Sequence, residues 1–206
     1  MKTATVVKNW VIGSTPEVLE NIHLNNVTIT SYNRDINILK KDIDDLTKQD
    51  IKFNSSGNID RILNEFIKAT ELDNDSMILE DIKRLLHLFK KVTASKELRL
   101  LLTTIDNDMC RKFHVDNNGL RMLCTYKGPG TLWLKEDNIN REALDLYEGN
   151  KSIVIDKNNI EQAKTGSVII LKGAKYSTQT TKGAVHRSPT IEESGEKRLL
   201  LRIDTN

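Results

Sequence analysis

Two side chains in the stretch KFHVDNNG, residues 112–119, have the chemistry and spacing of a metal site. His114 and Asp116 are two positions apart in a chain that contains only four histidines. Because side chains two apart on a β-strand point to the same face, this imidazole and this carboxylate would project together. An H-x-D pair is common by chance, so the interpretation needs a third ligand elsewhere in the chain.

A third ligand is available in the second half of the chain. His186, in KGAVHRSP, is the other histidine that follows the first hundred residues. Two neutral imidazoles and one ionised carboxylate, forms available near pH 7, hold one face of an octahedral ion and leave its other positions open. The sequence therefore predicts a metal site made by His114, Asp116 and His186. Spacing alone leaves the alternative open, which is a polar strand face with an unrelated loop histidine.

The last β-rich run, GEKRLLLRID, adds basic side chains to this prediction. Arg198 and Arg202 follow His186 by twelve and sixteen residues and share one strand face. A guanidinium inside a barrel is costly unless a carboxylate pairs with it, and its planar fork suits a bidentate carboxylate. One of these arginines could therefore bind the distal end of a dicarboxylic acid such as 2-oxoglutarate. The alternative is a surface arginine on an edge strand.

The two cysteines offer a rival ligand set. Cys110 has the strand parity of His114 and Asp116 if residues 109–116 form a regular strand, and Cys124 lies on the next β-rich run. A thiolate among the ligands would favour zinc over iron. A free cysteine is, however, more often a small buried hydrophobic side chain.

The elements that position these residues fall into two regions. Residues 1–96 show helical spacing of apolar side chains at Ile38–Gln49 and in the runs SSGNIDRILNEFIKAT and DNDSMILEDIKRLLHLFKKV. One early strand is predicted at Asn25–Asp35, where β-branched residues roughly alternate with polar ones.

Residues 97–206 contain mainly short β-rich runs and little helical spacing. A short helix is predicted in NINREALDLYEGN, and the rest reads as short strands with Asn, Gly, Pro or Asp between them. Seven such runs predict a small β-barrel or a double-sheet jelly roll, with the helical half packed on its outside as one compact unit. The runs are ELRLLLTTI, MCRKFHVD, LRMLCTYKG, TLWLKE, KSIVID, GSVIILKG and KRLLLRID.

Composition narrows the function classes. The formal net charge is +2 over 206 residues, and 38% of the residues are hydrophobic, which is typical of a soluble globular protein. The charges nearly cancel in each half, which argues against nucleic acid as a partner. The apolar runs are too short to cross a bilayer, and the start MKTATVVKNWVIG has no signal-peptide pattern. We therefore expect a cytoplasmic protein with no membrane partner.

The order of FHVD, LCTYKGPGTLWL, GSVIILKG and VHRSP…SGEKRLLLRID, over about residues 107–204, resembles the core of Fe(II)/2-oxoglutarate-dependent oxygenases, most closely the prolyl-hydroxylase-like branch. The resemblance implies a double-stranded β-helix, cupin-like in its architecture, for the second region. Together with the helices expected in residues 1–96, this predicts an α+β protein with a helical N-terminal half packed on that core. It implies that His114, Asp116 and His186 bind Fe(II), and that Tyr126 and Arg198 hold the tail of 2-oxoglutarate. Because Gly195 to Arg198 is one residue longer than the usual Gly-x-Arg, Arg202 competes for that role.

The phrases CTYKGPGT and VHRSP also resemble a bacterial family that carries only a domain-of-unknown-function label, whose genes often lie beside zinc-homeostasis genes. Three functions therefore stay open. The first is an oxygenase that uses Fe(II) and 2-oxoglutarate on a small molecule or peptide. The second is a zinc- or manganese-dependent cupin-like enzyme or metal-handling protein. The third is a β-barrel binding module with structural histidines.

Overall fold

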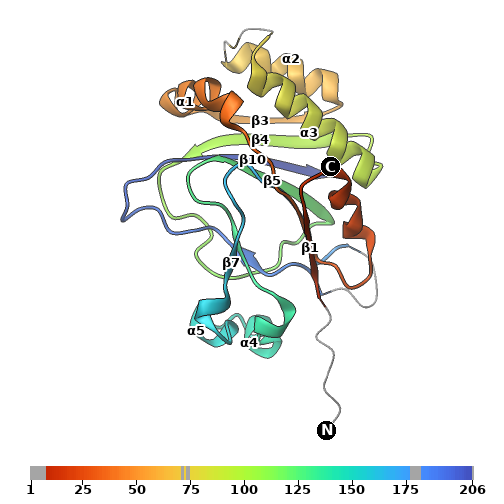
Figure 1. The fold of residues 1–206 in the computed structure, drawn as a ribbon, viewed down its shortest axis with the longest axis vertical. Coiled ribbons are helices and arrows are strands. Elements are labelled where there is room, and N and C mark those ends of the chain that lie inside the picture. Colours follow the sequence, from red (N-terminus) through yellow and green to blue (C-terminus); the bar gives the residue numbers. More distant parts are fainter. Residues whose placement is uncertain (1–7, 71, 73–74, 177–181, 206) are drawn as a thin grey trace.

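The structure, a computed structural model that describes residues 8–70, 72, 75–176 and 182–205, contains two β-sheets (Figure 1). The larger is a mixed sheet with the strand order β1-β2-β8-β5-β10-β4-β3. Its strands are β1 (Trp10–Gly13), β2 (Ile29–Tyr32), β3 (Lys52–Gly57), β4 (Leu98–Ile105), β5 (Leu120–Lys127), β8 (Val168–Lys172) and β10 (Arg198–Thr205). The smaller has the order β7-β6-β9 and consists of β6 (Leu132–Trp133), β7 (Glu161–Gln162) and β9 (His186–Arg187).

The two sheets share an apolar core. Leu123, Ile169 and Leu200 from the larger sheet form one buried cluster with Trp133 from the smaller sheet. The neighbouring residues on β5, β8 and β10, such as Met122 on β5, belong to a different cluster on the opposite face. The central strands are therefore buried on both faces, between the small sheet and a layer of helices.

That helical layer covers the outer face of the larger sheet (Figure 1). The helices are α1 (Lys40–Lys48), α2 (Ile59–Thr70) and α3 (Met77–Thr93), and the short 3₁₀ segments η1 (Pro16–His23) and η2 (Asn37–Leu39) lie in the same region of the chain. Apolar side chains at helical spacing on α3, such as Ile78, Ile82, Leu85 and Phe89, are fully buried. The three helices predicted from periodicity are confirmed.

A buried ion pair connects the helical layer to the sheet. Asp81 on α3 accepts hydrogen bonds from both terminal nitrogens of Arg34, and the Tyr126 hydroxyl of β5 donates to the same carboxylate at 2.7 Å. Asp81 and Arg34 are almost completely buried. The three side chains thus connect α3, the segment after β2, and the middle of the larger sheet.

The predicted N-terminal region contains more strand than expected. The predicted strand is confirmed as β2, but β1 and β3 also join the larger sheet. β3 has the polar sequence KFNSSG, in which Phe53 is the single large apolar residue, and it pairs with β4 over six residues. Its position in the sheet is set by pairing with a distant strand, which local patterning does not encode.

Two predicted strands of the second region are wrong. KSIVID forms the short helix α5 (Asn150–Ile153) and its following bend, and MCRKFHVD is irregular apart from a single bridge at His114. The Asn150 side chain accepts from Phe113 N and donates to Arg111 O, both at 2.8 Å, and so ties these two segments together. α4 (Arg141–Asp145) confirms the predicted short helix and packs with α5 beside the smaller sheet (Figure 1).

The remaining 3₁₀ segments, η3 (Glu136–Asn138) and η4 (Lys157–Asn159), flank α4 and α5 in the chain. In the described part of the chain, every helix is too short or too polar to cross a membrane.

Candidate metal centre

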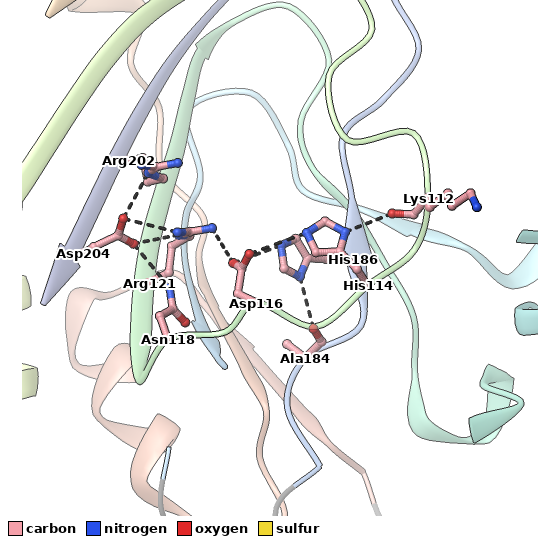
Figure 2. A network of polar contacts seen from close by, with 9 residues as sticks. All are labelled: Lys112, His114, Asp116, Asn118, Arg121, Ala184, His186, Arg202 and Asp204. Carbon is pink, nitrogen blue, oxygen red and sulfur yellow. Dashed lines mark hydrogen bonds and ion pairs between the residues drawn. The ribbon is translucent and has the colours of Figure 1, made fainter. Parts of the chain in front are cut away.

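The three predicted ligands meet at one point between the two sheets (Figure 2). His114 and His186 form a β-bridge in which each backbone N–H donates to the other residue's carbonyl at 3.0 Å. Asp116 Oδ1 lies 3.5 Å from His114 Nε2, and Asp116 Oδ2 lies 3.3 Å from His186 Nε2. One ligand atom from each residue falls within 4.8 Å of the others. The structure therefore brings together the triad that the sequence predicted.

Backbone carbonyls orient both imidazoles. His114 Nδ1 lies 2.9 Å from the Lys112 carbonyl, and His186 Nδ1 lies 3.1 Å from the Ala184 carbonyl (Figure 2). A carbonyl oxygen only accepts, so each Nδ1 carries a proton and donates it. This leaves each Nε2 directed at Asp116, which is the tautomer and orientation that a metal-binding histidine requires. The donor set fits a divalent cation.

The charges around Asp116 keep it ionised. Burial alone would raise the pKa of this carboxyl, but the hydrogen bonds with His114 and His186 and the charge of Arg121 hold its pKa well below the usual range. The hydrogen bond with Asp116 raises the pKa of His114, against the opposing effect of burial. A bound cation would take the place of the proton that this arrangement attracts.

The triad is open on one side. The side chain of His114 is 35% exposed, whereas those of Asp116 and His186 are 12% and 6% exposed. A cavity of about 670 Å³ begins at His114 and has mainly apolar walls. These walls come from the HxD segment and from the region of α4 and α5, and include Phe113, Val115, Leu144, Tyr147 and Ile153.

Arg121 on β5 was not predicted as a site residue, although it touches the triad. Its Nη1 lies 2.6 Å from Asp116 Oδ2, and its Nε lies 2.7 Å from Asp204 Oδ1 on β10. Arg202 Nε lies 3.0 Å from Asp204 Oδ2, so an alternating chain of charges extends from the triad across two strands (Figure 2). The pairing of Arg121 with Asp204 follows from the β5–β10 register, which the sequence alone did not give.

Three predicted site residues lie away from the triad. Tyr126 and Cys124 belong to the helix-facing cluster, where Tyr126 binds Asp81 and Cys124 contacts Arg34. Burial raises the pKa of the Cys124 thiol to about 11, which disfavours a thiolate. Cys110 is exposed and is not among the ligand groups that converge. The predicted co-substrate role of Tyr126 does not fit this position, and neither cysteine joins the triad.

Arg198 and Thr125 contact each other on the side of β10 and β5 that faces the smaller sheet. Arg198 on β10 is 1% exposed, and its Nη2 donates to Thr125 Oγ1 at 3.2 Å. Its Nε has no partner among the described residues, and burial lowers the pKa of Arg198 to about 10. A Cβ at Gly128 would lie 2.8 Å from Arg198 Cγ, so the glycine makes room for this side chain. Arg202, by contrast, is already paired with Asp204.

The two facing sheets form a double-stranded β-helix fold, and the triad lies between them. The structure is similar to that of the dioxygenase for auxin oxidation 1 from Arabidopsis thaliana, solved as a binary complex with 2-oxoglutarate, with a TM-score of 0.57 and 8% identity over 95% of this chain and 91% of that one. At this identity the likeness shows the fold.

The family is shown by the sequence. The chain belongs to the family described as "Protein of unknown function (DUF1826)", whose model matches residues 13–204. No curated protein matches the sequence. A prolyl-4-hydroxylase from Pseudomonas putida is a more distant structural relative, with a TM-score of 0.46 and 9% identity over 92% of this chain and 96% of that one.

Proposed function

We propose that this protein is an Fe(II)/2-oxoglutarate-dependent oxygenase that acts on a small molecule or a peptide. One observation carries the proposal: two histidines and one aspartate converge on the sheet face that also holds a buried arginine with no carboxylate partner among the described residues. Arg198, Leu200 and Arg202 alternate along β10 with residues of the helix-facing cluster, so they point toward the triad side.

The triad and Arg198 have the chemistry to hold Fe(II) and 2-oxoglutarate, respectively. His114 Nε2, His186 Nε2 and the Asp116 carboxylate would hold Fe(II) as a facial triad with open positions. Arg198, with Thr125 beside it, would hold the distal carboxylate of 2-oxoglutarate and relieve the cost of burying an unpaired cation. When bound, Fe(II) and 2-oxoglutarate supply the dioxygen activation that oxidises a C–H bond of the substrate.

The chain itself supplies position and environment. The Lys112 and Ala184 carbonyls keep both Nε2 atoms directed at the site, and Arg121 holds one oxygen of Asp116. The apolar walls of the cavity beside His114 would bind a nonpolar part of the substrate and exclude water from the reacting carbon.

Anaerobic addition of Fe(II) and 2-oxoglutarate to the apoprotein tests the proposal. We expect a weak visible charge-transfer band, lost in His114→Ala and Asp116→Ala and kept in Cys110→Ser, which changes an exposed side chain outside the triad. Oxygen should then yield succinate. A wild-type protein that gives neither band nor succinate would contradict the proposal.

A zinc protein is the second candidate, because two imidazoles and one carboxylate also form catalytic zinc sites with an open position. Metal analysis after expression without added iron separates the two. Stoichiometric zinc, removed by His114→Ala, together with no affinity for 2-oxoglutarate would favour zinc. Unchanged metal content in both ligand variants would instead indicate a binding module with structural histidines.

A further inference from the structure

A second cavity, of about 500 Å³, shares Phe113 with the cavity beside His114, but none of the three triad residues lines it. Its walls are Phe113, Arg187 and residues from the start of α5 to Ile160, which directly follows η4. Val185, two positions before Arg187, belongs to a buried apolar cluster with Phe113 and Ile153, outside the core between the sheets. Ala184 belongs instead to the core between the sheets. Strand alternation therefore directs Arg187 outward, while its neighbour His186 points to the triad.

Arg187 is an incompletely paired cation in this cavity. Its guanidinium lies 5.2 Å from the ring centroid of Phe113, and its Nη1 donates to the Ser188 carbonyl at 3.0 Å. Its Nε is buried and has no hydrogen-bond partner among the described residues, which also provide no ion pair within 4.0 Å. A half-buried guanidinium whose Nε is buried and unpaired favours an incoming anion.

The rest of the wall favours the same kind of ligand. Lys151 and Lys157 add two exposed cations, whereas Asp156 is the one acidic side chain in the wall. Asp156 Oδ1 already accepts the Asn158 backbone N–H at 2.9 Å, which fixes it within its own loop. The remaining wall is apolar and includes Val154, Ile160 and Ile155, the last of which is 66% exposed. Such a cavity combines an excess of positive charge with a hydrophobic surface.

We propose that this cavity is a second binding site, which takes an organic anion with an apolar body and one carboxylate or phosphate group that pairs with Arg187. The guanidinium fork binds either oxyanion through two hydrogen bonds, and Phe113, Val154 and Ile160 contact the apolar body. The site is separate from the triad and does not depend on Fe(II), 2-oxoglutarate or oxygenase activity.

Amide chemical shifts of the full-length apoprotein, titrated with four probes, test this site. Benzoate and phenyl phosphate should give saturable shifts at Phe113, Val154 and Ile160, and their ranking shows which oxyanion is preferred. Inorganic phosphate, which has no apolar body, should bind more weakly, and benzyl alcohol, which has no charge, should give no saturable shifts.

Substitutions in the cavity wall identify the side chain that binds the anion. Arg187→Gln should raise the Kd for the better probe about tenfold, the loss expected for one charge-assisted contact. Lys157→Gln should raise it about twofold to fivefold, and Lys164→Gln, an exposed change outside the cavity, should leave it unchanged. If Arg187→Gln does not fold, the double variant Lys151→Gln/Lys157→Gln serves in its place.

The proposal is overturned if benzoate and phenyl phosphate give no saturable shifts, if benzyl alcohol binds equally well, or if the variants leave Kd unchanged. Shifts confined to Thr125 and Leu200 would also overturn it, because they would place the anion between the sheets beside Arg198.

Discussion

Arg198 and Arg202 show how two identical residues on one strand face can have different roles. Arg202 Nε makes no hydrogen bond with the described residues, but it lies 3.0 Å from Asp204 Oδ2 in an ion pair with a carboxylate that Arg121 also contacts. Arg198 is more deeply buried and has only the neutral Thr125 hydroxyl as a hydrogen-bond partner among the described residues. Burying a cation in this way costs free energy that a ligand carboxylate would recover.

Arg198→Gln should therefore weaken 2-oxoglutarate binding without lowering the stability of the fold. We expect the affinity for 2-oxoglutarate to fall about tenfold to a hundredfold, since a charge-assisted bidentate contact is lost. The free energy of unfolding of the apoprotein should stay the same or rise, because an unpaired buried charge is removed. Calorimetric titration of the metal-loaded protein and urea denaturation of the apoprotein measure the two effects.

Arg202→Gln is the matched control. It should leave the affinity for 2-oxoglutarate within about twofold and slightly lower the stability, because Asp204 loses one partner. A loss of affinity in Arg202→Gln but not in Arg198→Gln would reverse the assignment.

At the scale of elements, β5 shows where prediction from sequence succeeds and where it fails. The run LRMLCTYKG correctly predicts a strand, but the strand is covered on both faces, so it contains no clean alternation that marks the site side. The resemblance pointed to Tyr126, and the structure places its neighbour Thr125 on the triad side. A shift of one residue moves a side chain to the opposite face.

Tyr126→Phe and Thr125→Val test this assignment of faces. Tyr126→Phe removes a hydrogen bond to the buried Asp81 carboxylate, so the free energy of unfolding should fall by about 1–3 kcal/mol while the affinity for 2-oxoglutarate stays unchanged. Thr125→Val should weaken 2-oxoglutarate binding a few-fold, because the partner of Arg198 is lost. Titration calorimetry and urea denaturation of both variants would show the opposite pattern if Tyr126 held the co-substrate.

The metal ligands could be predicted because residue type and spacing carried the signal. His114 and Asp116 are two apart, and His186 was the histidine left in the β-rich region, so the triad did not require an exact secondary structure. Indeed, the segment around His114 is not a regular strand. The helices were also predictable, since their apolar spacing is local, whereas β1, β3 and the two-residue strands depend on distant pairing partners.

Asp81 on α3 gives the fold a defined pH dependence. Burial would raise the pKa of Asp81, but its hydrogen bonds with Arg34 and Tyr126 and the nearby charges lower it below the ordinary value of 3.8. A carboxyl whose pKa is lower in the folded state stabilises the protein above its unfolded-state pKa. This stabilisation is lost as the pH falls through the folded-state pKa.

Asp81→Asn should therefore destabilise the protein most at neutral pH. We expect a loss of about 3 kcal/mol at pH 7, since Arg34 is left buried without a countercharge. The difference from wild type should persist at about pH 5 and shrink below about pH 4, where Asp81 in the unfolded chain binds a proton more readily than in the folded protein. Urea denaturation across this range measures it, with Asp145→Asn, an exposed carboxyl, as the control. A difference that grows toward low pH would contradict the assignment.

At the scale of the whole molecule, the metal centre depends on residues from both predicted regions. β2 pairs with β8, and β3 pairs with β4, so strands before residue 97 extend the larger sheet at both edges. The helices before residue 97 cover the outer face of β5, β8 and β10, where Met122, Ile170 and Leu201 are fully buried. The strands that carry Arg121 and Arg198 therefore depend on N-terminal strands at both edges of their sheet and on N-terminal helices over its outer face.

Residues 97–206 should accordingly not fold as an independent metal-binding unit. Without the helical layer, a large apolar surface of the sheet would be exposed to water, at a cost of roughly 25 cal/mol for each Å². Two new edges of unpaired backbone would also be left at β8 and β4. We expect the fragment to aggregate or to show a poorly dispersed NMR spectrum, and to bind no metal stoichiometrically.

The full chain, by contrast, should unfold in one transition. Circular dichroism and tryptophan fluorescence should give coincident denaturation curves, because Trp10 from β1 and Trp133 from β6 lie 6.0 Å apart and belong to the same core between the sheets. A well-dispersed spectrum and metal binding in the fragment, or two separate transitions in the full chain, would mean that residues 97–206 fold independently. The N-terminal helices would then be an addition to a complete metal protein, not a structural part of its centre.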